Sequence, residues 1–468
     1  MPAPGQRTPG FELGAEVEIT TAARSHARDL SDALTALGLS VSLVETPSST
    51  PRALILTEGL AADSAPDAVC WAALRQIQAV AQGLSSGQTT LVVLQSGGGN
   101  RPGGLKAAWR AGLTALAKTA QKEFPDAICR AIALTGQARQ TAEAGGLVAR
   151  ELMEGGETPD VMIGTRGRRR TARLVPVDMS GRTAPADRTA PPGPDDVFVV
   201  TGGARGVTAD CVVAFAARTG ARFALLGRSA LIPWPEDIPS NLEEAELRSA
   251  LAGQAREAGT KPKPSALRET ARALLAGREI RQTLARISAA GGHAIYLAAD
   301  LADPDKTDAA LMEAEQRLGP VTGLIHGAGV LADKRMTEKT EAQLQRVFAP
   351  KVLGLKRLVE RLSPARLRHV ALFSSAAAHF GNAGQADYAM ANEILNRLAW
   401  ALQQAQKHLS VTCIDWGPWD GGMVDASLRA HFERQGIALV PRDEGARLFA
   451  DLLMRGRSDA VEFCVGGL

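Results

Sequence analysis

Cysteine is scarce in this sequence, and the five cysteines, Cys70, Cys129, Cys211, Cys413 and Cys464, stand far apart without paired spacing. Closely spaced pairs mark zinc ribbons, and even sets mark disulfide frameworks. The sequence favours neither, and scattered single cysteines are typical of a reducing compartment. Histidine, cysteine and acidic residues nowhere cluster with the spacing of metal ligands, so we expect no metal site.

Excess charge and long apolar runs are also missing. The formal net charge is +3, with 53 lysine and arginine residues against 50 acidic ones. A balance this close predicts no nucleic acid as a partner. No apolar run reaches the length of a membrane-spanning helix, and the N-terminal stretch MPAPGQRTPG does not resemble a signal peptide. We therefore expect a cytoplasmic protein with no membrane partner.

Short apolar runs alternate with longer amphipathic ones through most of the chain. This alternation predicts an α/β protein with parallel sheets whose faces are covered by helices. A stretch rich in proline, alanine and glycine divides the chain. We expect two Rossmann-like, doubly wound lobes, and we assign the chain to a flexible leader (1–14), a structural lobe (15–180), a linker (181–196) and a catalytic lobe (197–468).

The first lobe lacks the glycine-rich turn that a nucleotide site needs. Its first expected strand and the turn that follows it, AEVEITTAARS at residues 15–25, contain no glycine. A later GGGN stretch, residues 97–100, lacks the GxGxxG spacing, and we favour a surface loop there. We therefore expect a degenerate lobe that binds no cofactor.

An arginine-rich stretch, TRGRRRTARLVP at residues 165–176, leaves two interpretations open. It could form a basic patch for nucleic acid or an acidic partner. It could also be a solvated hairpin that returns to the sheet. We favour the hairpin because the positive charges alternate into an apolar strand.

The second lobe opens on VFVVTGGARGVT, residues 197–208, in which an apolar strand runs into glycines and then into a helix. Glycines there let the backbone approach a pyrophosphate, and the helix N-terminus supplies N–H groups and partial positive charge. A strand before and a helix after are the context that this mechanism requires. The expected cofactor contacts are Thr201, Gly202, Gly203, Arg205, Gly206 and Val207.

The choice of cofactor rests on the end of the next strand, FALLGRS. NAD-preferring proteins place an acid there, whereas this chain has Arg228 and Ser229. A guanidinium suits a 2′-phosphate, so we favour NADPH over NADH, with a plain surface arginine as the alternative. Further contacts are expected at the ends of the following two strands, at Asp300, Leu301, His326, Gly327 and Ala328.

Residues 230–290 interrupt the alternation of strands and helices. A proline-rich loop is followed by two helical stretches that KPKPS separates. We expect a helical insertion that packs on the edge of the sheet, and a partner surface is the second possibility.

The stretch SSAAAHFGNAGQADYAMAN, residues 374–392, holds one of the two tyrosines of the chain. Tyr388 and Asn392 are one helical turn apart and so share a helix face, and Ser375 ends an apolar strand before them. Such a group can hold a carbonyl oxygen by hydrogen bonds and give it a proton as it becomes an alkoxide. The alternative is a tyrosine that is merely packed.

Together TGGARGVT, HGAG, Ser375, and Tyr388 with Asn392 resemble the short-chain dehydrogenase/reductase superfamily. Most of that superfamily has Tyr-x-x-x-Lys, whereas this chain has Tyr-x-x-x-Asn and Lys351 on the preceding helix. That exchange, with FSSAAA, GQADYAMAN and DWGPW, resembles the ketoreductase domains of modular polyketide synthases and polyunsaturated fatty acid synthases. Those domains also carry an N-terminal structural lobe. The resemblance is absent over 230–290.

The resemblance implies a role for each residue. It makes Tyr388 the proton donor, Ser375 the hydrogen-bonding partner of the substrate carbonyl, and Lys351 the cation that lowers the pKa of the tyrosine. Asn392 would hold the ribose or a proton-relay water. The implied reaction is the NADPH-dependent reduction of a β-ketoacyl thioester on an acyl carrier protein, with other synthase domains as partners. Taken alone, Lys351 could be a solvated helix lysine.

Substrate contacts are expected at Asp333, Phe380 and Met423. The family motif Leu-Asp-Asp, linked to the D-hydroxy product, appears here as Leu-Ala-Asp ending at Asp333. The tryptophan that marks the opposite hand would fall near Phe380 and is missing, so we expect the D product. Thr208 replaces the last glycine of the fingerprint and could crowd the helix or cap it.

Two other functions stay open. The chain could reduce free ketones or coenzyme A esters, although small free-standing reductases do not need an N-terminal lobe. It could also be a structural or docking module with a vestigial nucleotide fold, which the intact set of serine, tyrosine, asparagine and lysine contradicts.

Overall fold

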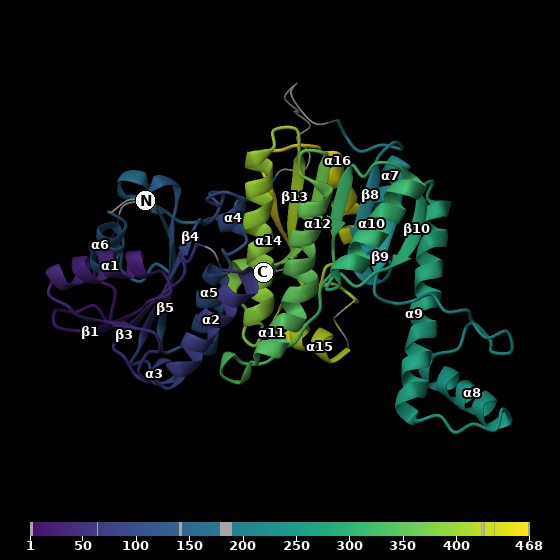
Figure 1. Cartoon of the computed structure of the whole chain (residues 1–468), viewed down its shortest axis with the longest axis horizontal. Helices are drawn as coiled ribbons and strands as arrows, with labels where there is room; N and C mark the ends of the chain where they lie inside the picture. Colours follow the sequence, from purple (N-terminus) through teal and green to yellow (C-terminus); the bar gives the residue numbers. More distant parts are fainter. Residues whose placement is uncertain are drawn as a thin grey trace.

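The computed structural model describes residues 3–62, 64–139, 143–177, 190–422, 424, 426–434 and 436–466. Within them the chain forms two α/β lobes, each built on a seven-stranded sheet. Figure 1 shows the lobes side by side, and we call residues 3–177 the N-lobe and residues 190–466 the C-lobe. The predicted fold class of two Rossmann-like lobes is confirmed.

The N-lobe sheet has the order β2-β1-β3-β4-β5-β6-β7, with β7 alone antiparallel to its neighbour. Strands β3, β4 and β5 are buried almost throughout, as expected of a parallel sheet with helices on both faces. The elements are β1 (Glu16–Thr20), α1 (Arg24–Ala36), β2 (Ser40–Val44), β3 (Ala53–Gly59), α2 (Pro66–Ala79), α3 (Ala81–Ser85), β4 (Thr90–Ser96), α4 (Leu105–Ala108), α5 (Leu113–Glu123), β5 (Ile128–Leu134), η1 (Gly136–Arg139), α6 (Ala144–Glu154), β6 (Asp160–Gly164), η2 (Thr165–Gly167) and β7 (Arg168–Arg170).

The C-lobe sheet is parallel throughout, with the order β10-β9-β8-β11-β12-β13-β14. The chain reverses its direction of winding between β8 and β11, which is where open α/β sheets bind ligands. The first elements are β8 (Val197–Thr201), α7 (Gly206–Thr219), β9 (Arg222–Gly227), α8 (Glu244–Glu257), α9 (Pro264–Ala289), β10 (His293–Ala298), α10 (Pro304–Leu318) and β11 (Gly323–His326). The remaining elements are η3 (Met336–Glu338), α11 (Glu341–Phe348), η4 (Ala349–Leu353), α12 (Gly354–Leu362), β12 (His369–Ser375), α13 (Ala376–Phe380), α14 (Ala386–Ala405), β13 (Ser410–Trp416), α15 (Ala426–Arg434), α16 (Arg442–Met454) and β14 (Glu462–Val465).

Helix α10 shows how local sequence sets an element boundary. Asp303 precedes the helix, and its carboxylate accepts hydrogen bonds from the backbone N–H groups of Asp305 and Lys306. Pro304 occupies the first turn, where its missing N–H costs nothing.

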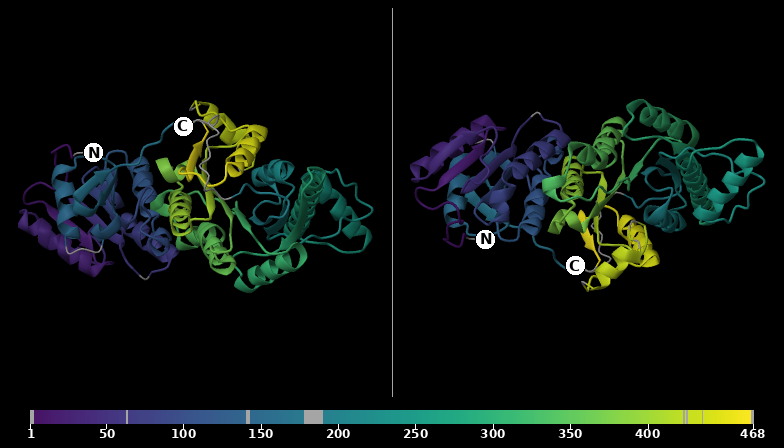
Figure 2. Two further views of the ribbon diagram at one scale, coloured as in Figure 1. Left: turned by 90° about the horizontal axis from the view of Figure 1, so that it is seen from above. Right: turned by 90° about the horizontal axis from the view of Figure 1, so that it is seen from below.

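The two lobes share one hydrophobic core. Helix α5 of the N-lobe lies along α14 of the C-lobe, and both views in Figure 2 keep the two lobes in contact there. This core includes Leu113, Leu116 and Ala120 of α5 and Met390, Ile394 and Leu398 of α14. The apolar contact therefore holds α5 in a fixed position beside the C-lobe sheet.

The insertion over 230–290 forms α8 and α9. The end of α9 nearer the sheet packs against α7 and β10, while α8 packs on the far end of α9, which projects away from the lobe in Figure 1. A separate small cluster of Ile238, Leu247, Ala271 and Leu274 holds this far end together.

Two expectations for the N-lobe are confirmed only in part. The arginine-rich stretch returns antiparallel to β6 as a hairpin, which confirms that part of the prediction. The strand spans only Arg168–Arg170, however, and Arg169 is buried against Glu151 rather than solvated.

The GGGN stretch is a loop as expected, and it is only partly at the surface, because Gly97 and Gly98 are buried whereas Asn100 is exposed. The carbonyl of Asn100 accepts a hydrogen bond of 2.7 Å from Gln404, which lies on α14. Helix α14 of the other lobe thus contacts this loop, and the local sequence carries no sign of this contact.

In the part of the chain that the structure describes, no helix combines the length and apolarity needed to cross a membrane. Among the same residues no cluster of three or more His, Cys, Asp or Glu side chains could hold a metal ion. Most of the expected linker, over 181–189, lies outside the described residues.

Candidate functional site

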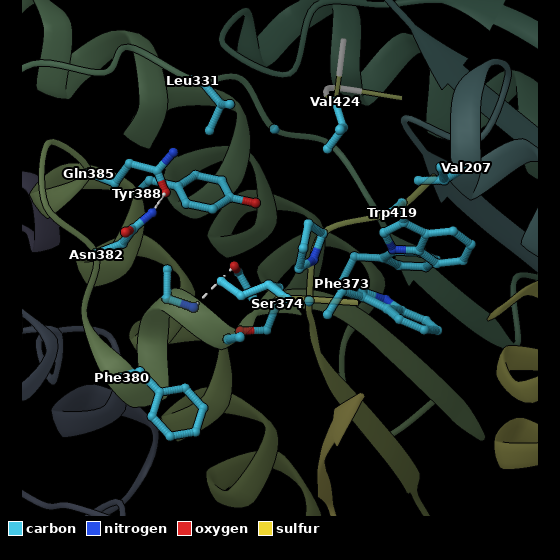
Figure 3. Close-up of a pocket in the computed structure, with 18 of the residues that line it drawn as sticks. Val207, Leu331, Phe373, Ser374, Phe380, Asn382, Gln385, Tyr388, Trp419 and Val424 are labelled. Carbon is cyan, nitrogen blue, oxygen red and sulfur yellow. Dashed lines mark hydrogen bonds between the residues drawn. The ribbon is translucent and has the colours of Figure 1, made fainter. Parts of the chain in front are cut away.

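A cavity of about 480 Å³ opens where strands β8, β11, β12 and β13 end at their carboxyl edge. Its walls are largely aromatic and aliphatic, and they carry a few polar groups that converge on the end of β12 (Figure 3). The lining residues include Val207, Gly327, Lys351, Ser375, Tyr388 and Trp416. An apolar pocket with a few converging polar groups at the switch point is the expected form of a ligand site.

The turn from β8 to α7 needs its glycines. Gly202 has a φ of 70°, and a Cβ there would lie 2.8 Å from the backbone carbon of Gly327 on the next loop. At Gly203 a Cβ would lie 2.3 Å from a methyl group of Val200. No side chain caps the first N–H groups of α7. This bare turn fits the pyrophosphate of a dinucleotide.

His326 is enclosed by protein. Its Nδ1 lies 2.8 Å from the hydroxyl of Thr201, and its Nε2 lies 3.0 Å from the carbonyl oxygen of Lys351. Because that carbonyl can only accept, Nε2 carries the proton and Nδ1 accepts from the threonine. Burial and the charge of Lys351 lower the pKa of His326 to about 3. The neutral imidazole ties β8, β11 and the turn of Lys351 together, and its ring has no free nitrogen for a cofactor.

Lys351 lies in η4, a π-helical turn between α11 and α12. Pro350 lacks an N–H group, and π turns of this kind are often found at functional sites. The side chain is 3% exposed, so the interpretation as a solvated lysine is wrong. Its Nζ donates to the carbonyl of Phe373 at 2.9 Å and lies 5.4 Å from the ring centre of Tyr388. Burial lowers the pKa of Lys351 to about 8.

Ser375, Tyr388 and Asn392 come together at the end of β12. Ser375 is the first cap residue of α13 and accepts from the N–H of Ala377 at 3.2 Å. Burial raises the pKa of Tyr388, and hydrogen bonding to Asn392 and Ser375 partly offsets that rise. The amide nitrogen of Asn392 donates to the backbone carbonyl of Tyr388 at 2.8 Å. Its buried Oδ1 has no hydrogen-bond partner among the described atoms.

The sequence did not reveal the ion pair that holds the tyrosine. Lys339 and Asp387 form a fully buried pair at 2.8 Å, and the same carboxylate oxygen accepts from the N–H of Tyr388 at 2.9 Å. Burial raises the pKa of Asp387, and Lys339 opposes this. Lys339 also donates to the carbonyl of Ala332 at 2.7 Å. The acid directly before the tyrosine was the one available signal.

The cofactor contacts that were expected after the second and third strands of the C-lobe lie at the ends of β9 and β10. Arg228 is exposed after β9, and the carbonyl of Ser229 accepts from the hydroxyl of Tyr296 at 2.7 Å. Arg205 is 3.5 Å from Glu279 of α9, so the insertion reaches the nucleotide loop. The carboxylate of Asp300 caps its own turn by accepting from the N–H of Ala302 at 3.0 Å.

Leu301, the neighbour of Asp300, is buried and packs against Gly354 of α12, where a Cβ would lie 2.8 Å from its own Cβ. Its side chain therefore supports the fold beside the site, and only its backbone is free to meet an adenine.

The expected substrate residues are placed unequally. Phe380 lines the cavity and is 36% exposed. Asp333 accepts from the side-chain amide of Gln385 at 2.9 Å, and Gln385 lines the cavity (Figure 3). Met423 lies outside the described residues, although Val424 next to it lines the cavity. Gln385 could not be predicted from the sequence, because its partner Asp333 lies on a loop that is distant along the chain.

The N-lobe also reaches the site. The two carboxylate oxygens of Glu123, at the end of α5, accept from the N–H groups of Met336 and Gly384 at 2.8 Å each. The amide nitrogen of Gln78 donates to the carbonyls of Met336 and Lys339 at 2.7 and 2.8 Å. These contacts hold the two loops that flank the tyrosine, and no motif in the sequence marks them.

Comparison with known families agrees with this geometry. Residues 197–421 match the family model described as KR domain. A polyunsaturated fatty acid synthase chain of a Thraustochytrium species is 36% identical over 315 residues, which cover 66% of this chain and 11% of that protein. The polyketide synthase PksL of Bacillus subtilis is 38% identical over 172 residues, 35% of this chain and 4% of that protein. The chain thus spans a small fraction of these curated relatives.

Solved structures show the same fold. A structure of A-type ketoreductases from a modular polyketide synthase has a TM-score of 0.72 at 21% identity, covering 100% of this chain and 91% of that one. A ketoreductase domain from the bacillaene assembly line has a TM-score of 0.67 at 21% identity, covering 97% and 93%. The fold of the chain thus agrees with that of solved ketoreductases, and residues 197–421 of its C-lobe are similar to the KR domain family.

Proposed function

We propose that this chain is an NADPH-dependent β-ketoreductase that converts a β-ketoacyl thioester on an acyl carrier protein to the β-hydroxyacyl thioester. The observation that carries the proposal is the convergence of Ser375, Tyr388 and Lys351 on one cavity beside the glycine turn. The division into a structural lobe (15–180), a linker (181–196) and a catalytic lobe (197–468) is part of the same proposal, as are other synthase domains as partners.

The side chains at the end of β12 act on the carbonyl oxygen. Ser375 and Tyr388 hold it by hydrogen bonds, and Tyr388 gives its proton to the alkoxide as it forms. A tyrosine whose pKa is raised by burial keeps that proton at neutral pH, which suits a donor. The ammonium of Lys351, 5.4 Å from the ring centre, then stabilises the phenolate. NADPH, when bound, supplies the hydride to the β-carbon.

The residues present fit this cofactor. The turn over 202–206 offers a cradle that a Cβ would fill, and the exposed Arg228 with Arg205 offers positive charge for a 2′-phosphate. The buried, unpartnered Oδ1 of Asn392 can accept a hydrogen bond from a ribose hydroxyl or from a relay water.

The test compares the wild type with Tyr388→Phe, using NADPH consumption with a β-ketobutyryl thioester. We expect the variant to lose about three orders of magnitude in kcat, because the general acid is missing. NADPH should still quench the intrinsic fluorescence of this variant, because the phenol hydroxyl is not needed to bind the cofactor. Equal turnover by both proteins would overturn the assignment of the tyrosine, and a wild type that binds no NADPH would favour the vestigial docking module.

A further inference from the structure

The charged residues of the cavity wall are unbalanced. Among the described residues that line it, Lys122 and Lys351 are the charged ones, and both are cations. Lys351 serves Tyr388, as described above. Lys122 comes from α5 of the N-lobe and has no part in the proposed chemistry.

Close contacts between the lobes fix α5 against the cavity. A Cβ at Gly381, in the loop between α13 and α14, would lie 2.6 Å from the backbone of Lys118 and Thr119. The hydroxyl of Thr119 accepts from the N–H of Asn382 at 3.3 Å. Glu123, the residue after Lys122, binds the same loop through the N–H of Gly384. Lys122 is therefore held at the cavity by its neighbours on the helix.

Lys122 has no acidic partner in the part of the chain that the structure describes. The next lysine along the helix, Lys118, pairs with Asp160 at 2.9 Å. Both oxygens of Glu123 are taken by backbone N–H groups. Lys122 is an exposed residue that still lines the cavity, and its partial burial lowers the pKa of its ammonium group. An unpaired ammonium group of this kind can form an ion pair with an anionic group of the ligand.

The position of Lys122 is on the substrate side of the cavity. Figure 3 shows Val207, at the start of α7, on one side of Ser374 and Phe380 on the opposite side. The cofactor turn lies with Val207. Helix α5 contacts α13 and the loop that follows Phe380, so Lys122 lies at the end of the cavity near Phe380, away from the cofactor turn.

We propose that Lys122 binds the phosphate of the phosphopantetheine arm that carries the acyl thioester, so that the N-lobe selects for phosphate-bearing substrates. The inference rests on the proposed ketoreductase function and adds a substrate determinant to the same site. A lysine ammonium and a phosphate form a charge-assisted contact that a neutral thioester cannot make.

The experiment measures kcat/KM for a matched pair of substrates, β-ketobutyryl phosphopantetheine and β-ketobutyryl pantetheine, which differ only by the phosphate. We expect the wild type to prefer the phosphorylated one by up to about fivefold, since an exposed ion pair is worth at most about 1 kcal/mol. Higher salt should reduce this preference. Lys122→Met should lose the preference through a higher KM with kcat unchanged, and Lys122→Arg should keep it.

Lys407→Met, at an exposed lysine outside the cavity, serves as the control and should retain the wild-type preference. A preference that survives in Lys122→Met would overturn the inference, and so would a wild type that turns over both substrates equally. Failure to reduce any thioester would overturn the proposed function itself. Carrier-bound and coenzyme A thioesters both bear the phosphate. If Lys122→Met lowers kcat/KM for the carrier thioester alone, the phosphate that Lys122 binds belongs to the arm of the carrier protein.

Discussion

The two lobes have the same kind of sheet but different first turns. In the C-lobe, β8 runs into Gly202 and Gly203, and the first N–H groups of α7 carry no side-chain cap. In the N-lobe, the hydroxyl of Thr20 at the end of β1 donates to the carboxylate of Glu58 at 2.9 Å. The N–H of Ala23, at the start of α1, is taken by the hydroxyl of Thr57 at 3.1 Å. Neither helix has a side-chain cap, so the two turns differ in their glycines and in these hydrogen bonds before α1.

The sheets also differ in strand order. The C-lobe has two strands beyond β8 on the side of β9 and β10, whereas the described N-lobe sheet ends at β2 beside β1. The proposed nucleotide site therefore rests on the chemistry of one turn and on the strands beside it, because a parallel sheet alone does not specify a function. The N-lobe contributes to the site in a different way, because its helices α5 and α2 form hydrogen bonds with the loops around Tyr388.

The sharpest way to break this comparison is Gly202→Val in the C-lobe. The residue has a φ of 70°, and a Cβ would lie 2.8 Å from the backbone of Gly327. We expect at least about a hundredfold weaker NADPH binding, since strain of about 1–2 kcal/mol adds to the clash. Fluorescence titration measures it. The matched change Ala22→Val, in the N-lobe turn, should leave NADPH affinity unchanged, and an equal loss there would contradict the distinction between the lobes.

Glu123→Ala tests whether the N-lobe supports the catalytic loops. It leaves the N–H groups of Met336 and Gly384 without their acceptor, at a cost of about 1–3 kcal/mol each where buried. We expect a lower thermal midpoint and about tenfold lower kcat/KM, with NADPH affinity unchanged. Glu123→Gln keeps one acceptor oxygen, so its thermal midpoint and its kcat/KM should lie between those of the wild type and the alanine variant. Wild-type turnover in the alanine variant would show that the N-lobe does not shape the site.

The pH dependence of turnover should report Lys351 of the C-lobe. Because its folded pKa is about 8, below the ordinary value of 10.5, the ammonium is lost as pH rises past about 8. The phenolate of Tyr388 then loses its cation, so kcat should decline above that pH, by less than tenfold per pH unit at first. Lys351→Met should be slow at every pH, with no decline near pH 8. A decline that persists in this variant would assign the titration to another group.

Glu58 of the N-lobe gives the smallest expected effect. Burial raises the pKa of its carboxyl above the ordinary value of 4.5. The protonated form therefore suits the folded state, and stability is lost as pH rises through the folded pKa. Glu58→Gln should raise the thermal midpoint slightly at pH 7 and leave it unchanged at pH 4. A midpoint that drops at pH 7 would mean that the carboxylate charge holds the turn together.

The sequence alone was enough to predict the parts of this protein that depend on adjacent residues. The strand, glycine turn and helix over 197–219 were visible because backbone approach requires glycine within a few positions. Tyr388 and Asn392 were visible because helical spacing places them on one face. The return of the arginine-rich stretch to the sheet was also predicted, although its strand is the run Arg168–Arg170 and not the apolar residues after it.

Only the tertiary structure decided the contacts between distant segments. Lys122 and Glu123 look like ordinary surface residues in the sequence. The place of Lys122 in the cavity wall and the hydrogen bonds of Glu123 arise because α5 packs on α14. The buried pair of Lys339 and Asp387, and the enclosure of His326, likewise join elements that no local pattern connects. Burial sets the pKa of Lys351 and Tyr388, and burial depends on which surfaces meet, which a single stretch of sequence does not specify.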